Sequence, residues 1–148
     1  MAKEIERKYL VTDFRYRSMA SRAVRIIQGY LSRDTRATVR LRIKGSRSFI
    51  TVKGLTKGAT RNEWEYEIPE ADAREMLEKL TDTAAGIDKT RYIVPYDGMT
   101  WEVDEFHGRH QGLVVAEIEL PTEDSPFTLP PFIGREVTGD PAYYNSNL

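Results

Sequence analysis

Three charged residues alternate at the start of the chain, in the stretch M-A-K-E-I-E-R-K-Y-L-V. Glu4, Glu6 and Lys8 are spaced two apart, so in an extended strand all three side chains point to one face. An edge strand with one face in water would explain this spacing. A strand whose charged face lines a binding site would explain it equally well. The remaining sequence has to decide between these two interpretations.

The same alternation recurs along the chain, and the charged face usually carries one sign. In residues 38–44 every charged side chain lies on one face and is basic, whereas in residues 62–68 and 116–120 every charged side chain on the corresponding face is acidic. Residues 89–94 are basic, and residues 101–106 are acidic. The alternating charged positions are Arg40, Arg42, Lys44, Lys53, Glu63, Glu65, Glu67, Lys89, Arg91, Glu102, Asp104, Glu117 and Glu119.

Each of these strands alone is explained most simply by an antiparallel sheet with one face in water. Taken together, the sorting by sign favours a site, because like charges two residues apart repel unless an opposite charge lies against them. A set of arginines and lysines indicates a polyanion, most simply phosphates. Carboxylates without histidine or cysteine indicate a hard divalent cation, Mg²⁺ or Mn²⁺. The pattern therefore predicts a metal–polyphosphate site on one face of a sheet.

The elements that must position these residues are mostly strands. About eight are predicted, among them 24–32, and the pair 38–44 and 49–53 is expected to form a hairpin. Residues 69–80 predict an amphipathic helix, while 12–23 and 140–148 are weaker helical candidates and 121–131 reads as a loop. If the sheet closes into a barrel, helices must cover its apolar outside and the lumen becomes a charged tunnel.

Composition limits the alternatives. A chain of 148 residues has the length of one domain. A net charge of −1 gives no basic field for nucleic acid or an acidic membrane. The absence of cysteine excludes disulfides, thiolate metal ligands and a thiol nucleophile. Because no apolar run reaches membrane-spanning length, we expect a soluble, cytoplasmic, single-domain protein without a nucleic-acid or membrane partner.

Eight motifs, in this order, make the chain resemble the CYTH superfamily, the triphosphate tunnel metalloenzymes. They are E-x-E-x-K, Q-G-Y-L, V-R-L-R, T-V-K, E-W-E-Y-E, K-T-R-Y, W-E-V-D-E-F and E-I-E-L. The resemblance extends through the ending E-V-T-G-D-P-A-Y-Y-N-S-N-L. It implies an α+β fold over residues 1–148, in which an eight-stranded antiparallel barrel encloses a charged tunnel and helices pack outside. Glu4, Glu6 and Lys8 are then expected to point into the lumen.

The resemblance also assigns roles to the alternating charges. It implies metal ligands at Glu4, Glu6, Glu63, Glu65, Glu117 and Glu119, with Glu67 a weaker match. It implies phosphate contacts from Lys8, Arg40, Arg42, Lys53, Lys89 and Arg91. Catalytic roles are expected for Lys8, Glu65, Lys89 and Asp104.

The implied activity is hydrolysis of the terminal phosphate of a triphosphate with Mg²⁺ or Mn²⁺. Inorganic tripolyphosphate is favoured, because Tyr30 and Phe106 are the only aromatic residues expected in the tunnel and rings are usually bound by stacking. A nucleoside or thiamine triphosphatase and an adenylate cyclase remain alternative enzymes. A non-catalytic polyphosphate or nucleotide sensor is the alternative outside enzymes. The sequence is compatible with a homodimer and does not fix the oligomeric state.

Overall fold

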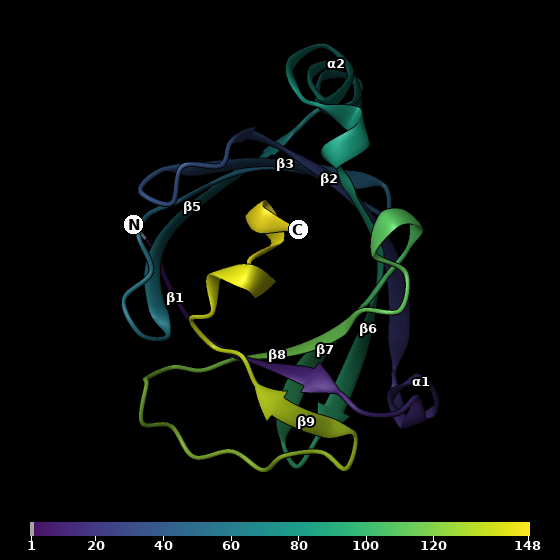
Figure 1. Ribbon diagram of the computed structural model, residues 1–148, viewed down its shortest axis with the longest axis vertical. Helices are drawn as coiled ribbons and strands as arrows, with labels where there is room; N and C mark the ends of the chain where they lie inside the picture. The colour runs from purple at the N-terminus through teal and green to yellow at the C-terminus, as the bar shows by residue number, and fades with distance from the viewer. Residues whose placement is uncertain (1) are drawn as a thin grey trace.

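Alternation of period two produces long antiparallel strands in this chain. The computed structural model describes residues 2–148, and its strands curve around a central space (Figure 1). The strands are β1 (Ala2–Val11), β2 (Arg22–Ser32), β3 (Thr38–Lys44), β4 (Arg47–Lys53), β5 (Thr60–Ile68), β6 (Ile87–Tyr96), β7 (Met99–Phe106), β8 (Val114–Glu119) and β9 (Ile133–Glu136).

The first eight strands close into a barrel through β1. The sheet runs β5-β4-β3-β2-β6-β7-β8-β1, and β1 pairs with β5 as well, which removes both edges. The first half of β1, Ala2–Ile5, pairs with β5, and its second half, Glu6–Leu10, pairs with β8. All of these pairings are antiparallel. The predicted eight-stranded antiparallel barrel is confirmed.

Two helices lie outside the barrel, as expected. Helix α2 (Glu70–Leu80) begins after Pro69 and packs over β2, β3 and β4, at the top of Figure 1. The short helix α1 (Arg15–Met19) packs on β6. None of the helices in residues 2–148 combines the length and the apolar character needed to cross a membrane.

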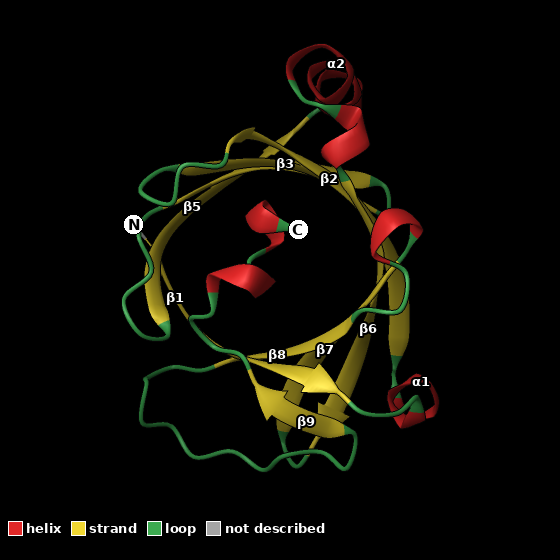
Figure 2. Cartoon of the chain, viewed as in Figure 1, coloured by secondary structure: helices red, strands yellow, loops and turns green. Residues whose placement is uncertain are grey.

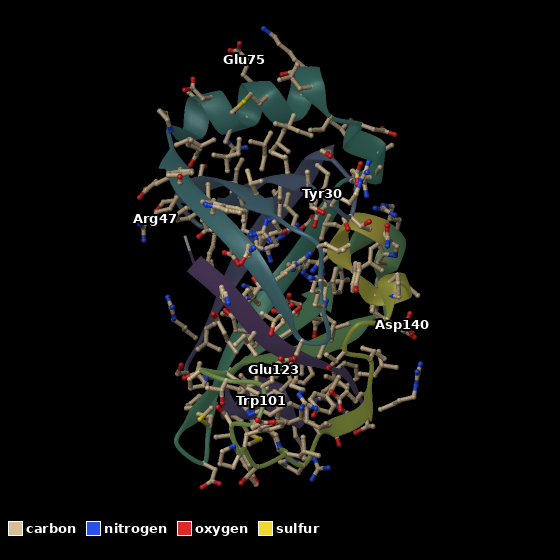
Figure 3. All side chains as sticks on the ribbon, turned by 90° about the vertical axis from the view of Figure 1, so that its left-hand side faces the viewer. Tyr30, Arg47, Glu75, Trp101, Glu123 and Asp140 are labelled. Atoms are coloured by element: carbon tan, nitrogen blue, oxygen red, sulfur yellow. The ribbon has the colours of Figure 1, made fainter. Side chains whose placement is uncertain are left out.

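The main apolar core lies outside the barrel wall rather than in its lumen. It is built from outward-facing residues of β1, β6, β7 and β8, which pack against α1 and the segment before β9. Tyr16, Trp101 and Phe132 are fully buried in it, and Figure 3 shows Trp101 in this lower layer of side chains. Placing apolar side chains outside leaves the inner positions of the strands free for charges.

Three segments differ from the sequence-based expectations. Strand β9 was not predicted, because four residues are too few to show a period. The helix expected over 12–23 is confined to Arg15–Met19, since the chain becomes extended at Arg22. The helix expected over 140–148 is two single 3-10 turns, η3 (Pro141–Tyr143) and η4 (Asn145–Asn147), which lie within the ring of strands in Figure 2.

The two tryptophans occupy different environments, although both fall on the apolar phase of their alternating strands, which predicts core or helix contacts for each. Trp101 is 0% exposed, with its ring 5.8 Å from that of Tyr9 and 5.9 Å from that of Phe127. Trp64 is 36% exposed on the outer face of β5, so that expectation is wrong for Trp64. Helix α2 covers β2 to β4 and leaves the outside of β5 open.

We therefore expect Trp101→Ala to lower the free energy of unfolding by about 3–5 kcal/mol, because it removes a large ring from a closed core. Trp64→Ala is the matched control on the same barrel and should cost less than about 1 kcal/mol. Urea unfolding of both variants measures the difference. Equal losses would contradict the assignment of the core to the β7 side of the barrel.

Candidate active site

The strand order sorts the inward-facing charges into two opposed walls. Strands β7, β8, β1 and β5 are consecutive around the barrel and carry mostly carboxylates, whereas β4, β3, β2 and β6 carry basic and neutral groups. The acidic wall presents Glu4, Glu6, Glu63, Glu65, Glu102, Glu117 and Glu119, and the basic wall presents Arg40, Arg42, Lys44, Lys53 and Arg91. In the sequence each strand carries charges of mostly one sign, and in the fold these strands form one acidic and one basic side of a single tunnel.

Between the walls lies a cavity of about 200 Å³. Besides the residues of both walls it is lined by Lys8, Tyr30, Thr38 and Arg61, and by Asn145 and Ser146 of the C-terminal turns. The structure thus brings together every predicted site residue except Lys89 and Asp104. Glu67, the weaker match, lies outside the cavity, where Arg47 donates to its carboxylate at 2.8 Å.

The basic wall is held in place by neutral side chains. Arg42 is buried, and its Nε donates to Gln28 Oε1 at 2.8 Å. Among the residues that the structure describes, Arg42 has no carboxylate within ion-pair distance. Arg40 differs, because its Nη2 lies 3.2 Å from Thr51 Oγ1 and 3.5 Å from Glu65 Oε2. Burial, followed by the charges of Arg40 and Arg91, lowers the pKa of Arg42. A buried guanidinium without a counter-ion is suited to an anionic ligand.

The carboxylates of the acidic wall fall into two groups. Burial would raise the pKa of Glu4, but Lys53 at 2.8 Å and other donors hold it well below its usual range. Lys8, at 3.4 Å, likewise outweighs burial and lowers the pKa of Glu117 to about 2. Glu6 has the opposite shift: burial, then Glu117 and Glu4, raise its pKa well above the ordinary value.

The carboxylates whose pKa values are raised are the ones that would suit a cation. Glu6 and Glu119 are directly opposed on the paired strands β1 and β8, and burial and Glu4 raise the pKa of Glu119 as well. Burial and a hydrogen bond with Glu4 raise the pKa of Glu63 to about 7. An all-oxygen set of this kind fits Mg²⁺ or Mn²⁺. Within residues 2–148, however, no three such side chains already form a group that could hold a metal ion.

Lys89 and Asp104 are buried and do not line the cavity, although they share the alternating phase of Arg91 and Glu102, which do. Asp104 is 2% exposed and accepts two bonds from Arg91, Nε–Oδ1 at 2.8 Å and Nη2–Oδ2 at 3.0 Å. Lys89 Nζ lies 2.8 Å from the same carboxylate, and its side chain is fully buried. Burial lowers the pKa of Lys89 from its usual value, an effect that Asp104 opposes, whereas Arg91 and Lys89 outweigh burial and hold the pKa of Asp104 far below its usual range. This triad fixes Arg91, which does reach the cavity.

Sequence reasoning missed several residues of the lining. Arg61 has the inward phase of β5, so alternation extended to the start of that strand would have found it, whereas Glu102 was found as an alternating charge but was given no role. Asn145 and Ser146 gave no periodic signal. Tyr30 lines the cavity as expected, whereas Phe106 packs with Ile87 and Val115 instead.

Fold and site together define a closed antiparallel barrel that surrounds a buried, two-sided charged tunnel. The CYTH domain model matches residues 2–144, and the chain belongs to the CYTH domain family. It is 50% identical over 148 residues to an inorganic triphosphatase of Acetivibrio thermocellus, covering 100% of this chain and 94% of that one. It is 39% identical over 150 residues to an inorganic triphosphatase of Nitrosomonas europaea, covering 98% and 95%. A crystal structure of an inorganic triphosphatase superposes with a TM-score of 0.70 at 36% identity, over 99% and 94% of the two chains.

The two groups of carboxylates should respond to neutralisation in opposite ways. The pKa of Glu6 is higher in the folded than in the unfolded chain, so its favourable contribution is complete below the unfolded pKa and is lost as pH rises through the folded one. With chelator present, Glu6→Gln should raise the free energy of unfolding at pH 8, and the gain should shrink toward pH 5. Asp104→Asn should instead destabilise by about 3–5 kcal/mol at pH 8, because it leaves buried Lys89 without its carboxylate and leaves Arg91 with Glu102 alone.

Urea unfolding across this pH range measures both effects. A Glu6→Gln variant that is less stable than the parent at pH 8 would show that Glu6 is compensated in the folded protein.

Proposed function

We propose that the protein is an inorganic triphosphatase, which hydrolyses the terminal phosphoanhydride bond of tripolyphosphate with the help of a divalent cation. The observation that carries this proposal is that one cavity has an uncompensated positive charge on one side and an uncompensated negative charge on the other. Among residues 2–148, Arg42 has no carboxylate within ion-pair distance on one side, and Glu6 has no basic group within that distance on the other. A polyphosphate with a bound metal ion would neutralise both charges, whereas a simple anion or a metal ion alone would neutralise only one of them.

The basic wall would bind the phosphate chain. Arg40, Arg42 and Arg91 can donate paired N–H groups to phosphate oxygens, and Lys8 adds a point charge from the opposite side. These donors would also stabilise the charge that develops when the terminal bridging bond breaks. Water attacks the terminal phosphorus, the bridging P–O bond breaks, and the products are orthophosphate and pyrophosphate.

The acidic wall would supply the cation site and the base. Glu6, Glu117 and Glu119, with Glu4 and Glu63 beside them, are the residues that would hold Mg²⁺ or Mn²⁺. When bound, such an ion neutralises phosphate charge and lowers the pKa of water. Glu65 is held by Thr51, whose Oγ1 donates to Oε2 at 2.8 Å, and we assign it the role of accepting the proton of the attacking water. Lys89 and Asp104 act indirectly, by holding Arg91 in position.

The lining supports an inorganic substrate. Tyr30 is the one aromatic side chain among the cavity residues, and its hydroxyl accepts from Gln28 Nε2 at 3.2 Å, which ties it to the basic wall. Little else offers a flat surface to a nucleobase or a thiamine ring. The two relatives named above are both inorganic triphosphatases. A cytoplasmic location and a homodimer stay predictions from the sequence.

A substrate panel tests the activity. Tripolyphosphate should be hydrolysed with a higher kcat/KM than ATP or thiamine triphosphate, because the tunnel can bind three phosphates but has little with which to bind a ring. Phosphate release should stop with chelator and return with Mg²⁺ or Mn²⁺. A preference for ATP or thiamine triphosphate would overturn the choice of substrate, and cyclic AMP as the product from ATP would favour a cyclase.

Arg42 provides the matching test of the basic wall. Arg42→Lys should lower kcat/KM for tripolyphosphate by about tenfold or more, because an ammonium cannot reproduce the fork of a guanidinium. Arg47→Lys is the control within the same hairpin. Arg47 is exposed, at the edge of the molecule in Figure 3, and its guanidinium forms an ion pair with Glu67 outside the cavity. Unchanged kinetics in Arg42→Lys would place Arg42 outside the substrate site.

A further inference from the structure

The C-terminal turns η3 and η4 occupy one mouth of the barrel, as the yellow end of the ribbon in Figure 1 shows. Lys8 Nζ donates to Tyr143 O at 3.1 Å, Arg33 donates to Ser146 O, and Arg109 Nη2 donates to Leu148 O at 2.7 Å. Leu148 packs against the cluster of Ile87, Phe106 and Val115. Basic side chains of the barrel and an apolar contact therefore hold this segment against the tunnel.

Asn145 is the residue of this segment that joins the cavity to the buried triad. It lines the cavity, and its Oδ1 accepts from Lys89 Nζ at 3.3 Å. Lys89 cannot turn away, because it is fully buried and its ammonium is also bound to Asp104. Asn145 thus contacts a fixed cation through its amide oxygen and, as a residue, lines the space between the charged walls.

The polarity of this contact fixes the orientation of the amide. An ammonium has donors and no acceptor, so only the oxygen of Asn145 can face Lys89, and the NH₂ group must point elsewhere. Among residues 2–148, no acceptor lies within hydrogen-bond distance of Nδ2, and Nδ2 is not among the buried polar atoms that lack a partner. The NH₂ group therefore has unused donors and is accessible, on a residue that lines the cavity.

We propose that Asn145 is a substrate-binding residue, whose amide NH₂, oriented by Lys89, donates a hydrogen bond to a phosphate oxygen of the triphosphate. This assignment rests on the proposed function, because it needs a phosphate chain in the cavity. Anionic oxygens accept strongly from neutral N–H groups, and a donor already held in place loses little freedom on binding. The C-terminal turns then supply part of the substrate site in addition to closing the mouth.

Two substitutions of Asn145 separate this role from a merely structural one. If Asn145 served only to hold Lys89, Asn145→Asp would form an ion pair with the ammonium and would be milder than Asn145→Ala. As a donor to phosphate, Asn145→Asp should be the worse of the two, because it removes the N–H and adds a negative charge beside a polyanion. We expect the KM for tripolyphosphate to rise about 3- to 10-fold in Asn145→Ala and about 10- to 100-fold in Asn145→Asp.

Asn62→Asp is the matched control, since it makes the same change on β5 at a residue that does not line the cavity, whereas Asn147 is unsuitable because its Nδ2 donates to Pro141 O at 2.8 Å and ties the two turns together. The KM of Asn62→Asp should stay within about twofold of the parent value. Thermal unfolding should show Asn145→Asp at least as stable as Asn145→Ala, so that the order of stability is opposite to the order of substrate affinity.

Kinetics at fixed free Mg²⁺ and calorimetric binding of tripolyphosphate without metal measure these effects. The proposal would be overturned if the KM of Asn145→Asp equalled that of the parent, rose less than that of Asn145→Ala, or were matched by that of Asn62→Asp. If the parent protein binds tripolyphosphate but does not hydrolyse it, the proposed function fails while the binding titration still decides the role of Asn145.

Discussion

The structure depends on one constraint: charges enclosed in a barrel must be balanced by other charges or by a ligand. Most are balanced within the protein, as where Lys53 meets Glu4 and Arg91 meets Asp104. These pairs lie at the two seams where the acidic and basic walls adjoin. Arg91 of β6 meets Asp104 of the adjoining β7. Lys53 of β4 lies 3.8 Å from Glu63 of the adjoining β5 and reaches Glu4 of β1 beyond it. Away from these two seams the walls face each other across the cavity. The charges that remain unpaired across the cavity favour binding of a charged ligand there, so the tunnel is a binding site and not part of the packed core.

Strand β1 connects this electrostatic arrangement to closure of the barrel. Its first half pairs with β5 and its second half with β8, so one strand joins two acidic neighbours. Because its side chains alternate, the same strand turns Glu4, Glu6 and Lys8 inward and Tyr9 outward into the apolar core. A slip of one residue in this register would exchange the two faces and would bury the core residues among charges.

Alternation predicted the inward-facing set well, because a period of two is a local property of the chain. It could not predict which strands are neighbours: β2 pairs with β6, and β1 with β5 and β8, across long stretches of sequence. Hence the two walls, and the burial of Lys89 and Asp104 away from the cavity, emerge only in three dimensions. Strand β9 and the turns at 141–147 were missed because elements this short carry no period.

The neutral side chains of the tunnel have a distinct role, which is to orient the charged ones. Gln28 binds Arg42, Thr51 binds both Arg40 and Glu65, and Asn145 binds Lys89. Arginine, lysine and glutamate have long side chains that lose much rotamer freedom when they are held in one position. Since these bonds are already formed in the folded protein, that loss occurs on folding rather than when substrate binds. Charge supplies the attraction for a polyphosphate, and the neutral groups supply the preorganisation that catalysis requires.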